Sequence, residues 1–327
     1  MPEIKVPEGL ISFIKTGSKF IIAGHKEPDG DCAGSQLALR SALRRLGKEA
    51  VACSAGPFKR IELKIYAGQF KNTPDESEKL GAKVIIIDCS NKDRIGDLKD
   101  ALEGLPCAVI DHHTAVSHPQ STAENPVFVE STSPSCTLLI EKLISSLGLE
   151  MTMEEAEFLL FGLCTDTGFF RHLTEKNADV FEAAARMIKA GANPKAAYNL
   201  MNGGKSYNSR ILLGKILART ESHFNGRLML SHETLEEFNF FGFEGRDSDS
   251  LNRMLLSIDS VEAAAIIRQE SIDDCTISLR SIDKIDVSKI AASLGGGGHK
   301  NASGLTMKGD IPFVKNILLK EFSVVFD

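Results

Sequence analysis

The chain has 327 residues, of which 43% are hydrophobic and 25% are charged, a composition typical of a folded protein with room for two domains. Its formal net charge of -6 argues against binding of long nucleic-acid duplexes, because such binding relies on a surface rich in Lys and Arg. A small phosphorylated substrate stays compatible with this charge, since carboxylates that hold divalent cations create local positive charge. The sequence has no apolar run of membrane-spanning length, no leader pattern and no Cys-x-x-Cys pair, so we expect a cytoplasmic protein with reduced thiols and no contact with membranes.

Strands and helices alternate in the first third of the chain. Apolar runs rich in β-branched residues predict strands that end at Gly24, Ser54, Asp88 and Asp111. Helical patterns separate them, over 31–46, 58–70 and 93–102. This alternation predicts an α/β fold in which a parallel sheet carries helices on both faces.

The rest of the chain reads as helices followed by a second, smaller α+β domain. Ser133 with Pro134 is expected to begin one helix, and Thr152 with Glu155 forms a capping box for the next. Further predicted elements are helices over 177–190, 195–201, 206–218, 287–294 and 311–322, a two-residue hairpin at Asn225-Gly226, and strands over 261–268 and 275–280. We therefore divide the chain into a first domain (1–202), a connecting linker and helix (203–221) and a second domain (222–327).

Acidic and imidazole side chains gather where the predicted buried elements end. Ligands of open parallel sheets collect at the carboxyl ends of the strands. Each residue alone reads as an ordinary turn or cap residue, but together they favour a metal centre, because two divalent cations about 3.5–4 Å apart need several anionic oxygens around them. The candidates are His25, Asp29, Asp31, Asp88, Asp111, His112 and Asp166.

This ligand set, rich in Asp and without Cys, points away from structural zinc and toward Mn²⁺ or Mg²⁺, and its imidazoles favour Mn²⁺ over Mg²⁺. The expected reaction is hydrolysis at phosphorus, with a water activated by two metal ions attacking in line. Asp31, His112 and His113 are the expected catalytic residues. His113 either hydrogen-bonds the phosphoryl or leaving-group oxygen or orients a neighbouring ligand, and both interpretations stay open.

Several other residues carry a functional and a structural interpretation. The glycine run Gly295–Gly298 with His299 either binds an anion through its N–H groups or is a flexible linker. Arg171 and Arg280 are either phosphate ligands or exposed arginines. Cys32, Cys89 and Cys164 lie beside candidate ligands, but we expect small buried fillers, because adjacent residues on a strand point to opposite faces.

Five motifs resemble, in order, those of the DHH phosphoesterase superfamily. They are His25-x-x-Pro-Asp29-Gly-Asp31 with Ser35, Ile87-Asp88, Asp111-His112-His113, Thr165-Asp166-Thr167-Gly168, and Gly295-Gly-Gly-Gly-His299-x-x-Ala-x-Gly304. The last is similar to the signature of the DHH-associated C-terminal domain. The compact two-domain length resembles the nanoRNase and pAp-phosphatase type.

The resemblance implies a division of roles among these residues, with the active site in the cleft between the two domains. His25, Asp29 and Asp88 would hold one Mn²⁺, and Asp31, Asp88, His112 and Asp166 the other. His113 would stay unligated near the scissile phosphate, and the substrate contacts would come from Arg171, Arg280, Gly296, Gly297, Gly298 and His299. The family tends to have an aromatic residue after the arginine of the fourth motif, where this chain has His172.

The expected substrates are therefore short oligoribonucleotides, linear dinucleotides such as pApA or pGpG, and pAp. The alternatives are an enzyme of the inorganic pyrophosphatase or exopolyphosphatase kind, and a non-catalytic nucleotide sensor. The expected cofactor is a pair of Mn²⁺ ions, with Mg²⁺ as the substitute. The oligomeric state stays open at this point, and a homodimer is the commonest closed assembly.

Overall fold

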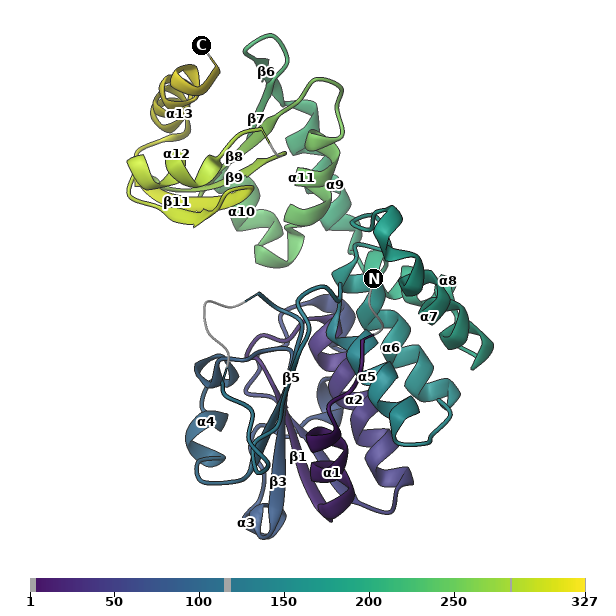
Figure 1. Ribbon diagram of the computed structural model, residues 1–327. Coiled ribbons are helices and arrows are strands. Elements are labelled where there is room, and N and C mark those ends of the chain that lie inside the picture. Colours follow the sequence, from purple (N-terminus) through teal and green to yellow (C-terminus); the bar gives the residue numbers. More distant parts are fainter. Residues whose placement is uncertain (1–3, 115–118, 283, 327) are drawn as a thin grey trace. The chain divides into compact units, whose positions relative to one another are not determined.

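The computed structural model describes residues 4–114, 119–282 and 284–326. They form two compact units, Met1–Gly204 and Lys205–Asp327, each built around a sheet of its own (Figure 1). The division falls inside the segment 203–221 that the sequence analysis treats as the connection. Residues 1–3, where no leader is expected, lie outside the described ranges. Within those ranges, no helix is both long and apolar enough to cross a bilayer.

A five-stranded parallel sheet forms the centre of the first unit. Its strand order is β2-β1-β3-β4-β5, and each neighbouring pair runs parallel, as the alternation of strands and helices predicts. The strands are β1 (Lys19–Gly24), β2 (Glu49–Cys53), β3 (Ala82–Ile87), β4 (Cys107–Asp111) and β5 (Val127–Val129). Because the strands are parallel, their carboxyl ends share one edge, and the candidate ligands follow three of these ends.

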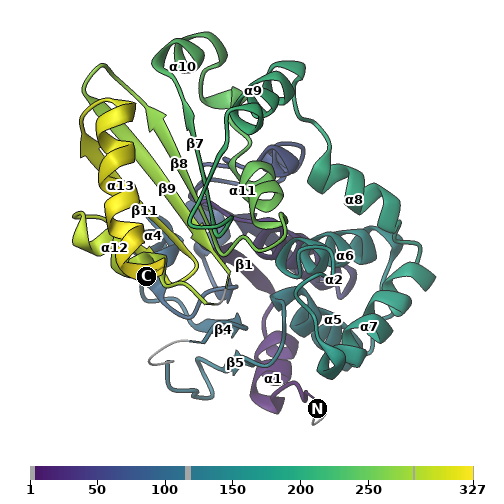
Figure 2. The same ribbon diagram turned by 90° about the horizontal axis from the view of Figure 1, so that it is seen from above.

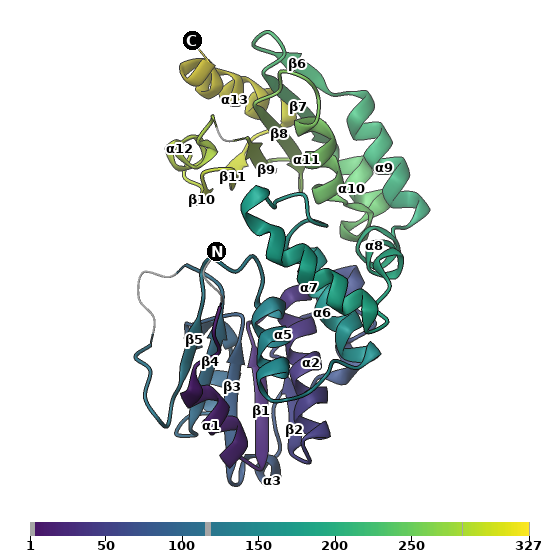
Figure 3. The same ribbon diagram turned by 45° about the vertical axis from the view of Figure 1, so that its right-hand side comes forward.

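Helices cover both faces of this sheet, which explains why its central strands are apolar over most of their length. On one face the core is formed with α1 (Glu8–Thr16), α2 (Gly30–Arg45), α5 (Cys136–Ser146) and α6 (Met153–Asp166). Figure 3 shows α2, α5 and α6 side by side on this face. The other face is covered by the 3₁₀ turn η3 (Lys92–Ile95) and α4 (Leu98–Ala101). The unit also contains α3 (Glu76–Lys79), α7 (Ala178–Lys189) and α8 (Pro194–Asn202).

Two predicted helices of the first unit are wrong. The segment 58–70 contains only two 3₁₀ turns, Ile61–Leu63 and Ala67–Gln69, because Tyr66 packs edge-on against Phe158 of α6 and local helix propensity gives way to this contact. The segment 93–102 is divided into η3 and α4 by Gly96, whose positive φ of 64° a continuous helix cannot accommodate.

The second unit is organised around a six-stranded mixed sheet of order β10-β11-β9-β8-β7-β6, in which only β7 and β8 pair in parallel among the described strands. The strands are β6 (Glu221–His223), β7 (Leu228–Glu233), β8 (Ala263–Gln269), β9 (Asp274–Ser281), β10 (Gly297–His299) and β11 (Ala302–Lys308). The helices are α9 (Tyr207–Ala218), α10 (Leu235–Phe241), α11 (Ser248–Leu256), α12 (Val287–Ser293) and α13 (Ile311–Phe326). α9 and α11 pack on one face, and α12 and α13 on the other (Figure 2).

Two details of this unit differ from the sequence analysis. β6 and β7 are joined by four residues rather than two, since His223 pairs with Leu228. The backbone has positive φ at Phe224, Asn225 and Gly226. The side chain of Phe224 points away from the turn and packs on Phe326. The predicted connecting helix, α9, packs its apolar side chains into the core of the second unit.

A close glycine contact joins α2 to α6. A Cβ atom at Gly34 of α2 would lie 2.4 Å from the carbonyl oxygen of Phe158, and one at Gly162 of α6 would lie 2.9 Å from the carbonyl oxygen of Gly30. Both distances are too short for a side chain, so glycine allows the two helices to approach. The contact sets the spacing between Asp31 on α2 and Asp166 at the end of α6.

We expect Gly34→Ala to lower the free energy of unfolding of the first unit by about 1–3 kcal/mol, because the new methyl group meets a backbone atom that cannot rotate away. Urea denaturation of the full chain measures this change. Gly9→Ala in α1 is the matched control, since its Cβ would meet only Pro126 Cβ at 3.8 Å. The control should stabilise by up to about 1 kcal/mol, and equal effects of the two substitutions would contradict the close contact.

Candidate metal centre

The turn from β1 into α2 presents His25, Asp29 and Asp31 together. The chain leaves β1 at Gly24, and the Asp29 side chain accepts a hydrogen bond from the backbone N–H of Cys32 at 3.0 Å, which makes it the N-cap of α2. The ring Nδ1 of His25 lies 2.9 Å from the carbonyl oxygen of Lys26. A carbonyl only accepts, so Nδ1 carries the proton and Nε2 is left to bind a cation.

Asp88 lies between two imidazoles. It follows β3 with a left-handed φ of 61° and is 1% exposed. Its Oδ2 is 3.5 Å from His25 Nε2, and its Oδ1 is 3.3 Å from His112 Nε2. Each oxygen of this one carboxylate therefore belongs to a different cluster, which is the arrangement required of a ligand that bridges two cations.

His112 connects three carboxylates that arrive from different elements. Its Nε2 lies 3.2 Å from Asp166 Oδ2 and 3.6 Å from Asp31 Oδ2, in addition to the contact with Asp88. Its Nδ1 faces the carbonyl oxygen of Ser133 at 3.1 Å, so the outer nitrogen is satisfied by the backbone as in His25. The second cluster thus gathers the ends of β3, β4 and α6 around the first turn of α2.

The carboxylate of Asp31 is fully buried against the start of α5. The backbone N–H groups of Cys136 and Thr137 donate to its two oxygens at 2.6 and 2.8 Å. These are the first two residues of α5, which therefore begins two residues after the predicted Ser133-Pro134 cap. The helix starts where its free N–H groups find a buried anion.

His113 is held by Asp111, and its Nδ1 also lies 3.5 Å from Asp88 Oδ1, so that Asp88, His112 and His113 form a further group of potential ligands. Its Nδ1 and backbone N–H both donate to Asp111 Oδ1, at 2.8 and 3.1 Å, while Ser90 Oγ donates to Asp111 Oδ2 at 2.5 Å. Although burial of Asp111 opposes the shift, these hydrogen bonds lower the pKa of its carboxyl group. The hydrogen bond to Asp111 uses Nδ1 of His113, so Nε2 takes no part in it, and the His113 side chain is 42% exposed.

Two buried ligand atoms without hydrogen-bond partners indicate that the clusters suit divalent cations. Within the described residues, the buried atoms Asp88 Oδ1 and His112 Nε2 have no hydrogen-bond partner, although each lies at ion-pair distance from the other. Buried polar atoms are rarely left unpaired in a folded protein. Asp31, His112 and Asp166 form one group whose ligand atoms lie within 4.8 Å of one another, and His25, Cys32 and Asp88 form another.

The electrostatics also favour bound cations. Burial and repulsion by Asp88 and Asp166 raise the pKa of Asp31, and burial raises the pKa of Asp166. Burial alone would lower the pKa of His112, but the carboxylates of Asp166 and Asp88 outweigh it and raise it to about 11. Asp29 and Asp88 likewise raise the pKa of His25 against the effect of its burial. Without a cation, protons on the imidazoles and carboxyl groups reduce the repulsion between the crowded carboxylates.

The structure places the predicted substrate residues in both units. In the first unit, Arg171 is exposed, and its guanidinium nitrogen Nη2 lies 3.3 Å from His172 Nε2. In the second, Arg280 pairs with Ala302 across β9 and β11, and Ala302 pairs with His299 across β11 and β10. Directly paired residues share a face of the sheet, so Arg280 and His299 lie on one face, two strands apart.

The glycine run is part of the sheet edge. Gly297 and Gly298 belong to β10, and a Cβ at Gly296 or Gly298 would lie 2.4 or 2.6 Å from a carbonyl oxygen of β11. Close strand approach therefore accounts for Gly296 and Gly298. Gly297 has open space at its Cβ position, and any anion contact of these glycines stays a prediction.

Cys32 is buried, as the sequence analysis expects, but it also falls into a group of potential metal ligands that sequence reasoning did not indicate. It was interpreted as a buried filler by an argument that applies to strands, but Cys32 lies in the first turn of a helix, one residue after Asp31. Helix geometry carries it back toward β1 and beside His25. The signal was available, because Asp29 is a typical N-cap residue and predicts helix from Gly30 onward.

We expect cation binding to release protons, because the raised pKa values of His25 and His112 mean that both imidazoles are protonated at neutral pH and must lose a proton to bind. The apparent Mn²⁺ affinity should therefore increase as the pH rises above neutrality, because the pKa values of both imidazoles are raised. Calorimetric titration in two buffers of different ionisation enthalpy measures the released protons. His232→Gln, outside the clusters, should behave as the wild type, and a buffer-independent heat would refute the protonated state.

Comparisons with known proteins agree with this geometry. The DHH family N-terminal domain model matches residues 19–163, and the DHHA1 domain model matches residues 235–323. The chain is 31% identical to the bifunctional oligoribonuclease and PAP phosphatase NrnA of Thermus thermophilus, over 88% of this chain and 84% of the relative.

Two solved structures share the fold. An exopolyphosphatase-related protein from Bacteroides fragilis has a TM-score of 0.81 at 23% identity, covering 97% of this chain and 95% of that chain. RecJ from Thermus thermophilus in complex with Mn²⁺ has a TM-score of 0.52 at 15% identity, covering 97% of this chain and 55% of that chain. The chain therefore belongs to the DHH phosphoesterase family, with a DHH catalytic domain followed by a DHHA1 domain.

Proposed function

We propose that this chain is a Mn²⁺-dependent phosphohydrolase that releases mononucleotides from short oligoribonucleotides and linear dinucleotides, and that converts pAp to AMP. The observation that carries the proposal is the position of Asp88, with one oxygen facing His25 and the other facing His112. The relative that is 31% identical is a bifunctional oligoribonuclease and PAP phosphatase, and the match spans most of both chains.

The metal assignment divides the clusters between two cations that share Asp88. His25 and Asp29 would complete one site, and Asp31, His112 and Asp166 the other. Such cations stabilise negative charge on phosphoryl oxygens and provide a hydroxide nucleophile at neutral pH. Imidazole ligands favour Mn²⁺ over Mg²⁺, and the RecJ structure of similar fold contains Mn²⁺.

His113 is the residue best placed to exchange a proton with the substrate. Its Nδ1 proton is held by Asp111, which fixes the tautomer and leaves Nε2 to contact a phosphoryl or leaving-group oxygen. Asp111 is itself oriented by Ser90, so the imidazole is positioned before the substrate arrives. Asp111 acts on the reaction through His113 and is a positioning residue.

The remaining contacts would recognise phosphate and set the length of the substrate. Arg280 and His299 share a face of the second sheet, about 10 Å apart by the spacing of two strands. Guanidinium and imidazole donors at this spacing suit the terminal phosphate and the next group of a short strand. Arg171 offers a further guanidinium from the first unit. The partners are accordingly short nucleotides and not long duplexes, and a homodimer stays a prediction.

A substrate panel tests the function. With Mn²⁺, the wild type should release mononucleotides from pApA, pGpG and short RNA, and phosphate from pAp. No product from any of them would refute the proposal, whereas turnover of pyrophosphate or polyphosphate alone would favour the alternative phosphohydrolase. Binding of nucleotides without turnover would identify a sensor.

Asp166→Asn is expected to abolish hydrolysis in this panel and at the same time to raise the melting temperature of the metal-free protein. The raised pKa of Asp166 shows that folding disfavours its ionised form, so its charge costs stability at every pH above its ordinary pKa, and the amide removes this cost. The substrate panel with Mn²⁺ measures the loss of hydrolysis, and differential scanning calorimetry without Mn²⁺ measures the melting temperature. Asp93→Asn, an exposed aspartate of η3 that contacts Lys99, is the matched control and should change neither. A lower melting temperature in Asp166→Asn would contradict the crowding of carboxylates.

His113→Gln should lower the turnover number by about 10²–10⁴-fold, the range of general acid–base catalysis, and leave Mn²⁺ affinity unchanged. Asp111→Asn should reduce turnover through the same step, because Nδ1 loses its acceptor and the tautomer is no longer fixed. Single-turnover kinetics and Mn²⁺ titration separate the two effects. Loss of Mn²⁺ from His113→Gln would instead make His113 a metal ligand.

A further inference from the structure

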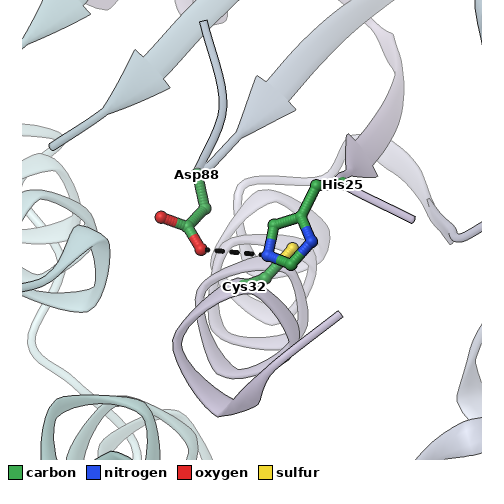
Figure 4. Close-up of side chains that lie close together, drawn as sticks. All are labelled: His25, Cys32 and Asp88. Atoms are coloured by element: carbon green, nitrogen blue, oxygen red, sulfur yellow. Dashed lines mark ion pairs between the residues drawn. The ribbon is translucent and has the colours of Figure 1, made fainter. Parts of the chain in front are cut away.

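A sulfur atom, Cys32 Sγ, lies in the group of potential metal ligands that contains His25 and Asp88. The ligand atoms of His25, Cys32 and Asp88 all lie within 4.8 Å of one another, and all three residues are buried. Figure 4 shows the three side chains converging from the end of β1, the first turn of α2 and the end of β3. Each element that carries them is fixed in the core of the first unit, so the group is preformed.

The backbone holds this sulfur in place. A Cβ atom at Gly24 would lie 2.2 Å from Cys32 Sγ, so the sulfur occupies space that only glycine leaves open at the end of β1. The thiol makes a weak contact, 3.6 Å, with Gln36 Oε1, and it also hydrogen-bonds the His25 side chain. Gln36 Nε2 also donates to the carbonyl oxygens of Ile22 and Cys53, so the amide that faces the thiol is anchored.

The donor set differs in kind from that of the second cluster. His25 offers Nε2, which lies 3.5 Å from Asp88 Oδ2 and 3.8 Å from Asp29 Oδ1. The same imidazole therefore has a carboxylate oxygen on one side and a thiol on the other. Oxygen donors suit Mn²⁺ and Mg²⁺, whereas a thiolate selects Zn²⁺ and Cd²⁺.

We propose that His25, Cys32 and Asp88 form a binding site for thiophilic divalent cations, in which Zn²⁺ displaces the Cys32 proton and occupies the position of one catalytic cation. This inference builds on the proposed metal centre and adds a sulfur ligand to it. The preference for Zn²⁺ over Mn²⁺ should then be larger at the His25 side, since the group formed by Asp31, His112 and Asp166 contains no cysteine.

Other cysteines do not offer the same chemistry. Cys89 is next to Asp88 in sequence, but its Sγ contacts the carbonyl oxygen of Ile87 at 3.6 Å. Cys275 is buried in the second unit and contacts the carbonyl oxygen of Gly309 at 3.3 Å. In the part of the chain that the structure describes, Cys32 is the cysteine that falls into a group of potential metal ligands.

Spectroscopic titration of the metal-depleted full chain tests the site without reference to turnover. Cd²⁺ and Co²⁺ should each produce a sulfur-to-metal charge-transfer band in the wild type, which disappears in Cys32→Ser and in Cys32→Ala. Cys275→Ser is the matched control, because it replaces an equally buried thiol elsewhere, and it should keep the band. Zn²⁺ affinity should fall about tenfold or more in Cys32→Ser, the loss typical of a weakened metal site.

Each outcome separates this inference from the proposed function. A wild type that hydrolyses the panel with Mn²⁺ but shows no charge-transfer band overturns the sulfur site alone. A wild type with the band and no turnover overturns the function alone. A band that persists in both Cys32 variants assigns the sulfur to another cysteine and refutes the proposal, and circular dichroism of both variants verifies that they are folded.

Discussion

The hydrogen bonds between the Asp31 carboxylate and the start of α5 are the interaction on which the metal centre depends. Asp31 is fully buried among other carboxylates, and a charge in this position is unfavourable unless fixed donors face it. The first two N–H groups of α5 supply these donors, together with the positive end of the helix dipole. One anion thereby determines where α5 begins, and α5 in turn supports α2 and α6.

Much of this architecture could be predicted from the sequence. β1, β3 and β4 are apolar over most of their length because helices cover both faces of the sheet, and this pattern is visible in one chain without any relative. The strands end in acidic or imidazole residues, so the shared edge of a parallel sheet brings His25, Asp88 and His112 together. The bridging position of Asp88 follows from its place on the central strand β3, between β1 and β4.

The features that escaped prediction depend on contacts distant in sequence. Ser133 and Ser135 are both typical N-cap residues, and the anion that favours the later start is more than 100 residues away, at Asp31. The segment 58–70 has helical propensity and loses it to packing of Tyr66 on α6. Cys32 is a different case: its neighbours predict a helix, and the error lay in applying the geometry of a strand to it.

The four carboxylates of the centre do not cost the protein equally, and part of the reason lies in the helix ends that carry them. Asp29 and Asp31 lie at the N-terminus of α2, where the helix dipole favours negative charge. Asp31 also accepts hydrogen bonds from the first N–H groups of α5. Asp166 is the last residue of α6, where the helix dipole is unfavourable to an anion. Burial and the neighbouring carboxylates raise its pKa further. Although burial opposes the shift, hydrogen bonds from His25 and from the Cys32 N–H lower the pKa of Asp29, whereas the pKa values of Asp31 and Asp166 are both raised. Folding alone therefore stabilises the charge of Asp29, whereas the charges of Asp31 and Asp166 depend on a bound cation. The cation that faces Asp166 and His112 should accordingly contribute the larger share of stability to the first unit, while the position beside His25 is free to vary in the kind of ion that it accepts.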